Sequence, residues 1–269
     1  MNNNLFSKEF TRNAASMVIW TLVITILISV TMAIYPVFLE NQSKITALFS
    51  ILPKGALQFK GISNVNDLLS VLGFYAVNNI IYMMVLGSIY SIVLFSGILL
   101  KEEYNKTAEY LLTRPITRSE IFTSKLAVAF LNIILLNCIT SLAGFLFMHI
   151  VKTDTFSVRA FLILSVYTLL LNILFGAIGL FVSTLIKRAR PITTFSIGLV
   201  LIMYFIYTLS KITPGASKIG YLSPFRFADV DALNPEYSLH FWNFMYFAGI
   251  SAVLMVLAYR NYRKKDIYI

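Results

Sequence analysis

Six long apolar runs dominate this chain and constrain its fold more than any other feature of the sequence. A helix of about twenty residues, rising 1.5 Å per residue, crosses a hydrocarbon core of roughly 30 Å. Membrane strands would instead alternate apolar and polar residues, and runs such as Ile133-Ile134-Leu135-Leu136 do not alternate. Only 13% of the residues are charged, against about 25% in soluble proteins. The sequence therefore predicts an all-α, multi-pass membrane protein.

The apolar runs divide residues 1–269 into a single transmembrane domain with six spans. These are predicted at residues 16–38, 74–100, 126–150, 160–186, 192–210 and 241–259. Segments 39–73 and 211–240 contain Pro and Gly and are predicted to be long outer loops. Before the first span, Leu5, Phe6 and Phe10 lie among charged residues, a pattern that favours a short interfacial helix.

The basic residues indicate the orientation of the chain, because Lys and Arg are retained in cytoplasmic segments. With the N-terminus inside, 14 of the 22 basic residues lie on the inner side, whereas the acidic residues divide evenly. Both termini are therefore expected in the cytoplasm, and the protein in the cell (plasma) membrane. The net charge of +10 is explained by this topology, so no nucleic-acid partner is expected.

The hairpin between spans two and three, residues 101–125, holds five basic and four acidic residues. Such a mixture favours a protein partner or plain solvation over an anionic lipid surface. Tyr104, Ala108 and Leu111-Leu112 fall on one helical face, and Pro115 ends that helix. Thr117-Arg118-Ser119-Glu120 then has the pattern of a capping box. We expect a helix, a proline break and a second, capped helix.

The hairpin resembles the corresponding stretch of permease subunits of the type-2 ATP-binding-cassette (ABC) transporter superfamily. The family has six spans and a coupling helix between spans two and three. Lys106 stands where many members have glycine, so the turn before Thr107 is expected to stay helical. The residues that carry the resemblance are Glu103, Thr107, Glu109, Leu111-Leu112, Arg114-Pro115-Ile116, Arg118, Ile121 and Lys125.

The resemblance implies a permease subunit of an ABC transporter, working as an exporter with a second permease, the same or different, and with separate ATPase subunits. Apolar hairpin residues would enter a groove of the ATPase, and charged ones would form pairs at its rim. The implied docking residues are Glu103, Thr107, Glu109, Leu111, Leu112, Arg114, Pro115, Ile116 and Arg118. A membrane scaffold or assembly subunit that transports nothing is the alternative, and substrate-stimulated ATPase activity would distinguish the two.

The sequence contains no phosphate-binding loop of the G-x-x-x-x-G-K-[ST] type, so ATP and Mg²⁺ are expected in the partner and no cofactor in this chain. His149, His240 and Cys138 lie apart, a spacing that predicts no metal site. The predicted spans contain essentially no internal acids or bases, which argues against ion-coupled transport. Their amides are expected to join helices, or else to line a translocation path: Asn78, Asn79, Asn132, Asn137 and Asn172.

Overall fold

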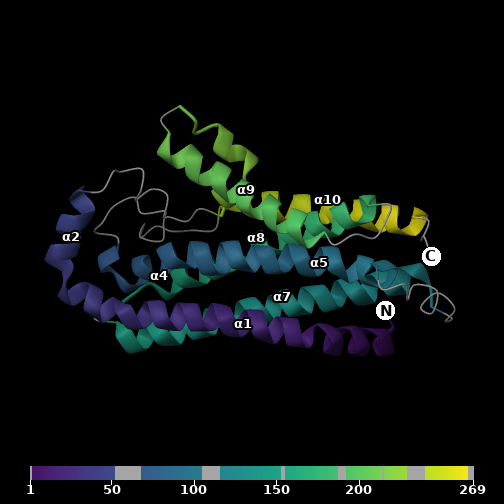
Figure 1. Cartoon of the computed structure of the whole chain (residues 1–269), viewed down its shortest axis with the longest axis horizontal. Helices are drawn as coiled ribbons and strands as arrows, with labels where there is room; N and C mark the ends of the chain where they lie inside the picture. Colours follow the sequence, from purple (N-terminus) through teal and green to yellow (C-terminus); the bar gives the residue numbers. More distant parts are fainter. Residues whose placement is uncertain are drawn as a thin grey trace.

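The computed structural model describes most of the chain, and every described element is helical (Figure 1). The described residues are 2–51, 68–104, 116–152, 155–186, 192–213, 215–228 and 240–265. Within them, six helical stretches are long and apolar enough to cross a membrane. These are α1 (Asn3–Glu40), the run α4 (Val71–Asn79), η2 (Ile80–Leu86) and α5 (Gly87–Tyr104), α7 (Arg118–Val151), α8 (Val158–Leu185), α9 (Thr193–Ile212) and α10 (Phe241–Lys264).

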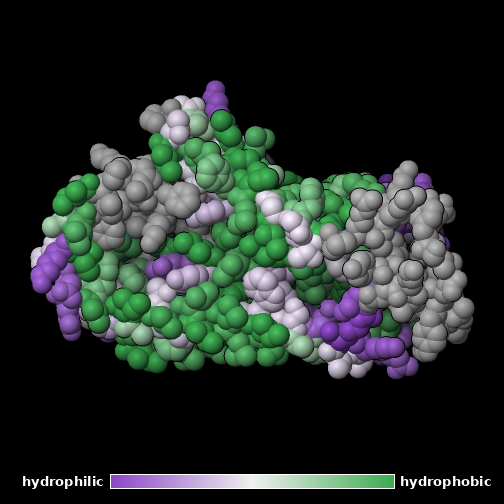
Figure 2. Space-filling model, in the orientation of Figure 1, coloured by the Kyte–Doolittle hydropathy of each residue, from purple (hydrophilic) through white to green (hydrophobic). Residues whose placement is uncertain are grey.

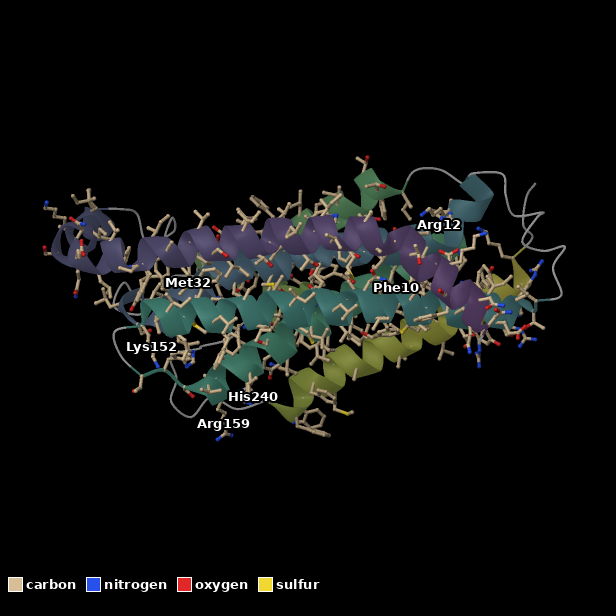
Figure 3. All side chains as sticks on the ribbon, turned by 90° about the horizontal axis from the view of Figure 1, so that it is seen from below. Phe10, Arg12, Met32, Lys152, Arg159 and His240 are labelled. Atoms are coloured by element: carbon tan, nitrogen blue, oxygen red, sulfur yellow. The ribbon has the colours of Figure 1, made fainter. Side chains whose placement is uncertain are left out.

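The long helices run side by side along the molecule, and α9 leans away from the others (Figure 1). The two termini lie at one end, which we call the terminal end. Arg12 lies toward this end, whereas Lys152, Arg159 and His240 lie toward the opposite one (Figure 3). On the face seen in Figure 2, apolar side chains cover most of the middle and hydrophilic ones gather toward the ends, as expected of a bundle that crosses a bilayer.

Helices α1 and α7 are much longer than the membrane requires. With 38 and 34 residues they are about 57 and 51 Å long, against a hydrocarbon core of roughly 30 Å. Helix α1 is continuous from Asn3, so the helix expected around Leu5, Phe6 and Phe10 is the first part of α1 and leads into the span without a break. The extra turns can extend beyond the hydrocarbon core and contact one another.

The second span is interrupted by a π-helical segment, η2, between α4 and α5. In an uninterrupted α-helix, the nine residues from Asn79 to Ser88 make two and a half turns and place these side chains on opposite faces. Both nevertheless bond to α8, Asn79 to Thr168 Oγ1 and Ser88 to Asn172 Oδ1. The i→i+5 hydrogen bonds of η2 wind each residue through a smaller angle and so bring both side chains to the same side.

Helices α5 and α8 pack closely because α8 presents glycines at the contact. A Cβ added at Gly179 would lie 2.5 Å from the backbone oxygen of Ile92, and one at Gly176 would lie 2.8 Å from Ser91 Oγ. These glycines therefore allow the two helices to pack closely.

Short elements lie between the long helices. Helix α2 (Gln42–Ile51) follows α1 within the first expected loop. The 3-10 turns η3 (Ile219–Leu222) and η4 (Pro224–Arg226) lie between α9 and α10. Phe225 of η4 is buried against the rings of Phe175, Tyr204 and Tyr207, so this segment is packed against α8 and α9.

Candidate functional site

The start of α7 is fixed by the capping box that the sequence predicted. Thr117 Oγ1 accepts a hydrogen bond from the Glu120 amide at 3.2 Å, and Glu120 Oε2 accepts one from the Thr117 amide at 2.9 Å. Each side chain thus satisfies an amide that the first turn of a helix leaves without a backbone partner. Helix α7 begins at Arg118 for this local reason, within the hairpin 101–125.

Two turns into α7, the ammonium of Lys125 is buried between three helices. Its Nζ lies 3.3 Å from Glu9 Oε1 on α1 and donates to the backbone oxygen of Ile98 on α5 at 2.7 Å. Lys125 is 1% exposed and Glu9 2%. Arg12 adds a second cation, with Nη1 3.6 Å from the same Glu9 oxygen. One buried ammonium therefore joins both ends of the hairpin, through α5 and α7, to α1.

The first turns of α1 cross α7 at this place. Asn2 N donates to Ser124 Oγ at 3.0 Å, while Glu9 pairs with the neighbouring Lys125. Asn2 and Glu9 are separated by about 10 Å of helix rise, yet they meet adjacent residues of α7. The two helices must cross here, and Figure 3 shows α1 turning near Phe10 and Arg12.

Helix α10 ends against the same part of α7. Arg118 Nη1 donates to the backbone oxygens of Arg263 and Lys265, at 3.2 and 2.8 Å. A cation beside the final carbonyl groups of a helix is favourable because the helix dipole is negative there. Ser119 Oγ and Tyr259 Oη lie 2.9 Å apart. The first turns of α7 thus contact α1, α5 and α10, and we call residues 98–101 and 116–125 the hairpin base.

The predicted docking residues lie mostly beyond this base. Arg118 belongs to the base and bonds within the chain, and Ile116 is partly buried against the core. Glu103 is in the last turn of α5, and its side chain lies outside the description. The others lie outside the described residues: Thr107, Glu109, Leu111, Leu112, Arg114 and Pro115.

Four of the five asparagines are buried within the chain. Asn79 donates to Thr168 Oγ1, and Asn172 Nδ2 donates to Asn137 Oδ1 at 3.3 Å while Asn172 Oδ1 accepts from Ser88. Asn132 donates to the Val128 oxygen in its own helix. The bonds of Asn79 and Asn172 join helices, which is the first of the two roles considered for the amides, whereas the bond of Asn132 stays within α7.

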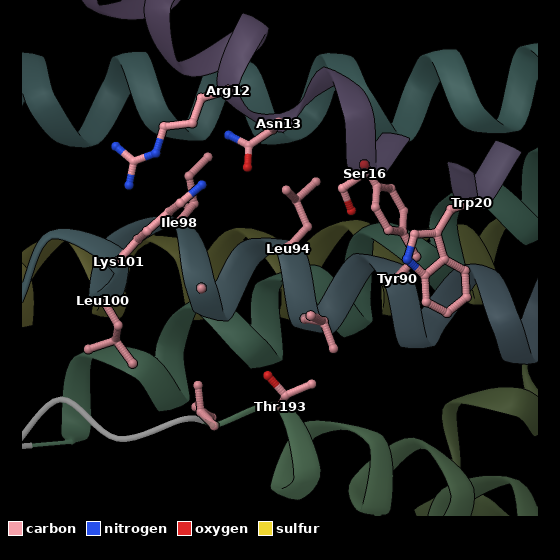
Figure 4. Close-up of a pocket in the computed structure, with 13 residues that line it drawn as sticks. Arg12, Asn13, Ser16, Trp20, Tyr90, Leu94, Ile98, Leu100, Lys101 and Thr193 are labelled. Carbon is pink, nitrogen blue, oxygen red and sulfur yellow. The ribbon is translucent and has the colours of Figure 1, made fainter. Parts of the chain in front are cut away.

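Asn78 differs from the other amides. It is partly buried and donates to the Phe74 oxygen one turn earlier in α4. A groove of about 400 Å³ between α1, α5 and α9 is lined by none of the five asparagines (Figure 4).

The sequence did not predict the pair between Glu9 and Lys125. The sequence places Lys125 among the nine charges of the hairpin, and the structure shows it in α7 with its side chain buried. One feature of the sequence does indicate that Lys125 is buried. Lys125 lies beyond the capping box and next to an apolar run, so it is already inside a helix that packs in the bundle.

Comparison with known protein families agrees with this architecture. Residues 3–267 match the family described as "ABC-2 family transporter protein", which is nearly the whole length of the chain. A search of curated proteins finds no match. The family match extends over all six long helical stretches and the hairpin base, and the resemblance noted for the hairpin points to the same family. The chain therefore belongs to the ABC-2 family of transporter proteins.

Proposed function

We propose that this chain is the permease subunit of an ABC exporter in the plasma membrane, driven by separate ATPase subunits that bind ATP and Mg²⁺ and dock on hairpin 101–125. The observation that carries the proposal is the hairpin base. A force applied to the hairpin reaches α5 and α7 directly, α1 through Glu9, and α10 through Arg118. Four of the long helices are thus connected to the docking segment.

The proposal places the terminal end in the cytoplasm. The basic residues support this orientation, because most of them belong to segments at the N-terminus, the hairpin, residues 187–190 and the C-terminus. In this orientation the hairpin lies on the cytoplasmic side of the membrane, where an ATPase subunit would dock on it.

A second permease, the same or different, would complete the translocation path. Helix α1 supports this, because one of its faces carries large apolar side chains that the chain itself leaves exposed, and such a face must meet lipid or protein. They include Val18, Ile19, Leu22, Ile26, Val30 and Ile34. Transport would then require two packings of these helices, with different affinities for the ATP-bound partner.

Co-purification of the ATPase tests the docking step. Leu111→Asp and Leu112→Asp place a charge where the hairpin is proposed to enter an apolar groove, and we expect both variants to reach the membrane but lose the ATPase. Leu222→Asp is the matched control, since Leu222 is exposed on η3 away from the hairpin. An ATPase with a phosphate-binding loop that co-purifies equally with all three variants would contradict the proposal.

Transport itself requires a second assay. In reconstituted vesicles, the complex of the two subunits should show ATPase activity that responds to a transported compound, and Leu111→Asp should abolish the response. An assembled complex whose ATPase activity never responds would instead support a scaffold subunit that transports nothing.

A further inference from the structure

Helix α10 has the dimensions of one membrane crossing between a tryptophan and an arginine. Arg260 lies eighteen residues beyond Trp242, which is about 27 Å of helix rise, against a hydrocarbon core of roughly 30 Å. Trp242 is 81% exposed, and tryptophan is enriched at membrane-water boundaries. Arg260 therefore lies close to the other boundary, at the terminal end of the molecule.

One side of α10 faces away from the rest of the chain. Of the six spanning stretches, α10 is the least buried. At 3.6 residues per turn, a row of exposed residues falls opposite the buried Phe247, Ala258 and Tyr262. This row, which we call the outward face of α10, consists of Trp242, Val253, Val256, Arg260 and Lys264.

The outward face belongs to a helix that lies across the bundle from α1. Figures 1 and 3, which view the molecule along directions at right angles, both show α1 and α10 on opposite sides over most of their length. The exposed face of α1 is the one proposed to meet a second permease, so this step rests on the proposed function. The outward face of α10 is then left to the lipid of the bilayer.

The terminal end of the outward face is basic. Arg260 and Lys264 lie one turn apart on it, with Arg263 beside them, and all three residues are exposed. Within the described part of the chain, the side chains of Arg260 and Lys264 form no ion pair or hydrogen bond, and the guanidinium of Arg263 lies 5.8 Å from the centre of the Tyr259 ring. The headgroup layer is roughly 5 to 7 Å thick, about the rise of this turn. These cations therefore lie at the level of the lipid phosphates.

We propose that this basic end binds anionic lipid headgroups of the leaflet at the terminal end, with the phosphates at Arg260 and Lys264 and the acyl chains along Val253 and Val256. Residues 260–266 contain four basic residues and one acidic residue. Such a cluster directly beside a span favours anionic over zwitterionic headgroups. The hairpin, with five basic and four acidic residues, has no comparable excess.

The proposed lipid contact is connected to the hairpin base. Arg118 donates to the backbone oxygens of Arg263 and Lys265, so the turn of α10 that faces the headgroups also contacts the first turn of α7. A lipid bound on the outward face restrains these two carbonyl groups. Anionic lipid should therefore stabilise the start of α7.

Photochemical capture at a single position tests the lipid contact. A diazirine amino acid in place of Val256 lies one turn before Arg260 on the outward face, and the chain is reconstituted in vesicles with equal amounts of phosphatidylglycerol and phosphatidylcholine. Mass spectrometry of the adducts then counts the two lipids. We expect the otherwise unchanged chain to capture phosphatidylglycerol about ten times more often, because each Lys or Arg near a membrane surface contributes about 1 kcal/mol, or about fivefold.

Two double variants test the role of the basic end. Arg260→Gln with Lys264→Gln should lower the ratio of captured phosphatidylglycerol to phosphatidylcholine by about fivefold or more. Lys152→Gln with Arg159→Gln is the matched control, since it removes two exposed cations toward the opposite end of the molecule (Figure 3) and should leave the ratio unchanged.

Hydrogen exchange tests the connection to the hairpin base. Amides in the first turn of α7 should exchange more slowly in vesicles with phosphatidylglycerol than in pure phosphatidylcholine, and the variant Arg260→Gln with Lys264→Gln should lose this difference. Equal exchange of the wild type in the two kinds of vesicle would show that the lipid does not act on the hairpin base.

Three outcomes of the capture experiment would overturn the proposal. The first is equal capture of the two lipids, or a ratio that Arg260→Gln with Lys264→Gln leaves unchanged. The second is capture of another copy of the chain in place of lipid, which would make the outward face an interface between copies. The third is loss of the preference in millimolar inorganic phosphate, which would indicate a site for free anions. The experiment needs neither ATPase nor transport, so its failure is distinguishable from failure of the proposed function.

Discussion

Glu9 Oε1 lies 3.3 Å from Lys125 Nζ, although the two residues are 116 positions apart and each lies near the start of a long helix. The pair is almost completely buried, and the lysine also bonds to the Ile98 oxygen. In a protein interior, the attraction within an ion pair offsets the loss of hydration only when both members are present. The geometry of the hairpin base therefore depends on both residues together.

Removing one member of this pair should destabilise the protein strongly. Lys125→Met leaves the Glu9 carboxylate buried, and we expect the free energy of unfolding to fall by about 3 to 5 kcal/mol. Denaturation in mixed micelles measures this change. Arg12→Gln is the control, because the Arg12 side chain is 31% exposed and its pair should contribute no more than about 1 kcal/mol.

The double variant Glu9→Gln with Lys125→Met should be more stable than Lys125→Met alone, since no uncompensated charge remains. If Lys125→Met unfolds like the wild type, the pair does not hold the hairpin base together.

The capping box should determine the stability of the first turn of α7. Thr117→Ala removes the oxygen that accepts from the Glu120 amide, and the loss of such a cap costs about 0.5 to 2 kcal/mol. Hydrogen exchange of the amides in the first turn of α7 should accelerate accordingly. Thr117→Ser keeps the oxygen and should exchange like the wild type; equal acceleration in the two variants would mean that the methyl group, and not the cap, is important.

The side-chain amide of Asn172 should stabilise the protein because it bonds to residues of both α7 and α5. Asn172→Ala leaves Asn137 Oδ1 and Ser88 Oγ without this partner, and we expect a loss of about 1 to 3 kcal/mol. Asn78→Ala removes a bond within one helix and should change stability by about 0.5 kcal/mol at most. Unfolding curves of both variants under one set of conditions make the comparison, and equal losses would argue against a bridging role for Asn172.

Substitution by alanine should destabilise the protein at Gly179 and stabilise it at Gly249. At Gly179, the added Cβ would lie 2.5 Å from the Ile92 backbone oxygen, so α5 and α8 must separate, at a cost of about 1 to 3 kcal/mol. At Gly249, nothing lies within 4 Å, and the better helix propensity of alanine should stabilise α10 by up to about 1 kcal/mol. Thermal unfolding in detergent measures both changes, and a neutral Gly179→Ala variant would contradict the close contact.

Cysteine labelling tests the proposed orientation. In a Cys138→Ser background, Lys152→Cys and Lys264→Cys place single thiols at exposed positions toward opposite ends of the chain. A membrane-impermeant maleimide added to intact cells should label position 152 but reach position 264 only after the membrane is permeabilised. The reverse pattern would place the terminal end outside.

The sequence alone determined the features that depend on residues close together in the chain. Long apolar runs predict spanning helices because unpaired backbone groups are too costly in hydrocarbon, and the spacing from Thr117 to Glu120 is sufficient for a capping box. The hairpin motif also predicted the family, which the match over residues 3–267 confirms.

Only the tertiary structure decided which residues meet across helices. Whether Lys125 lies at the surface or in the interior depends on where Glu9 and Ile98 are placed by α1 and α5. Likewise, Asn79 and Ser88 both face α8 because η2 changes the winding of the second span, and a regular period of 3.6 residues would have separated them. The physical reason is the same in both cases: helix-helix contacts depend on the rotation and crossing of whole helices, which the packing of the entire bundle determines.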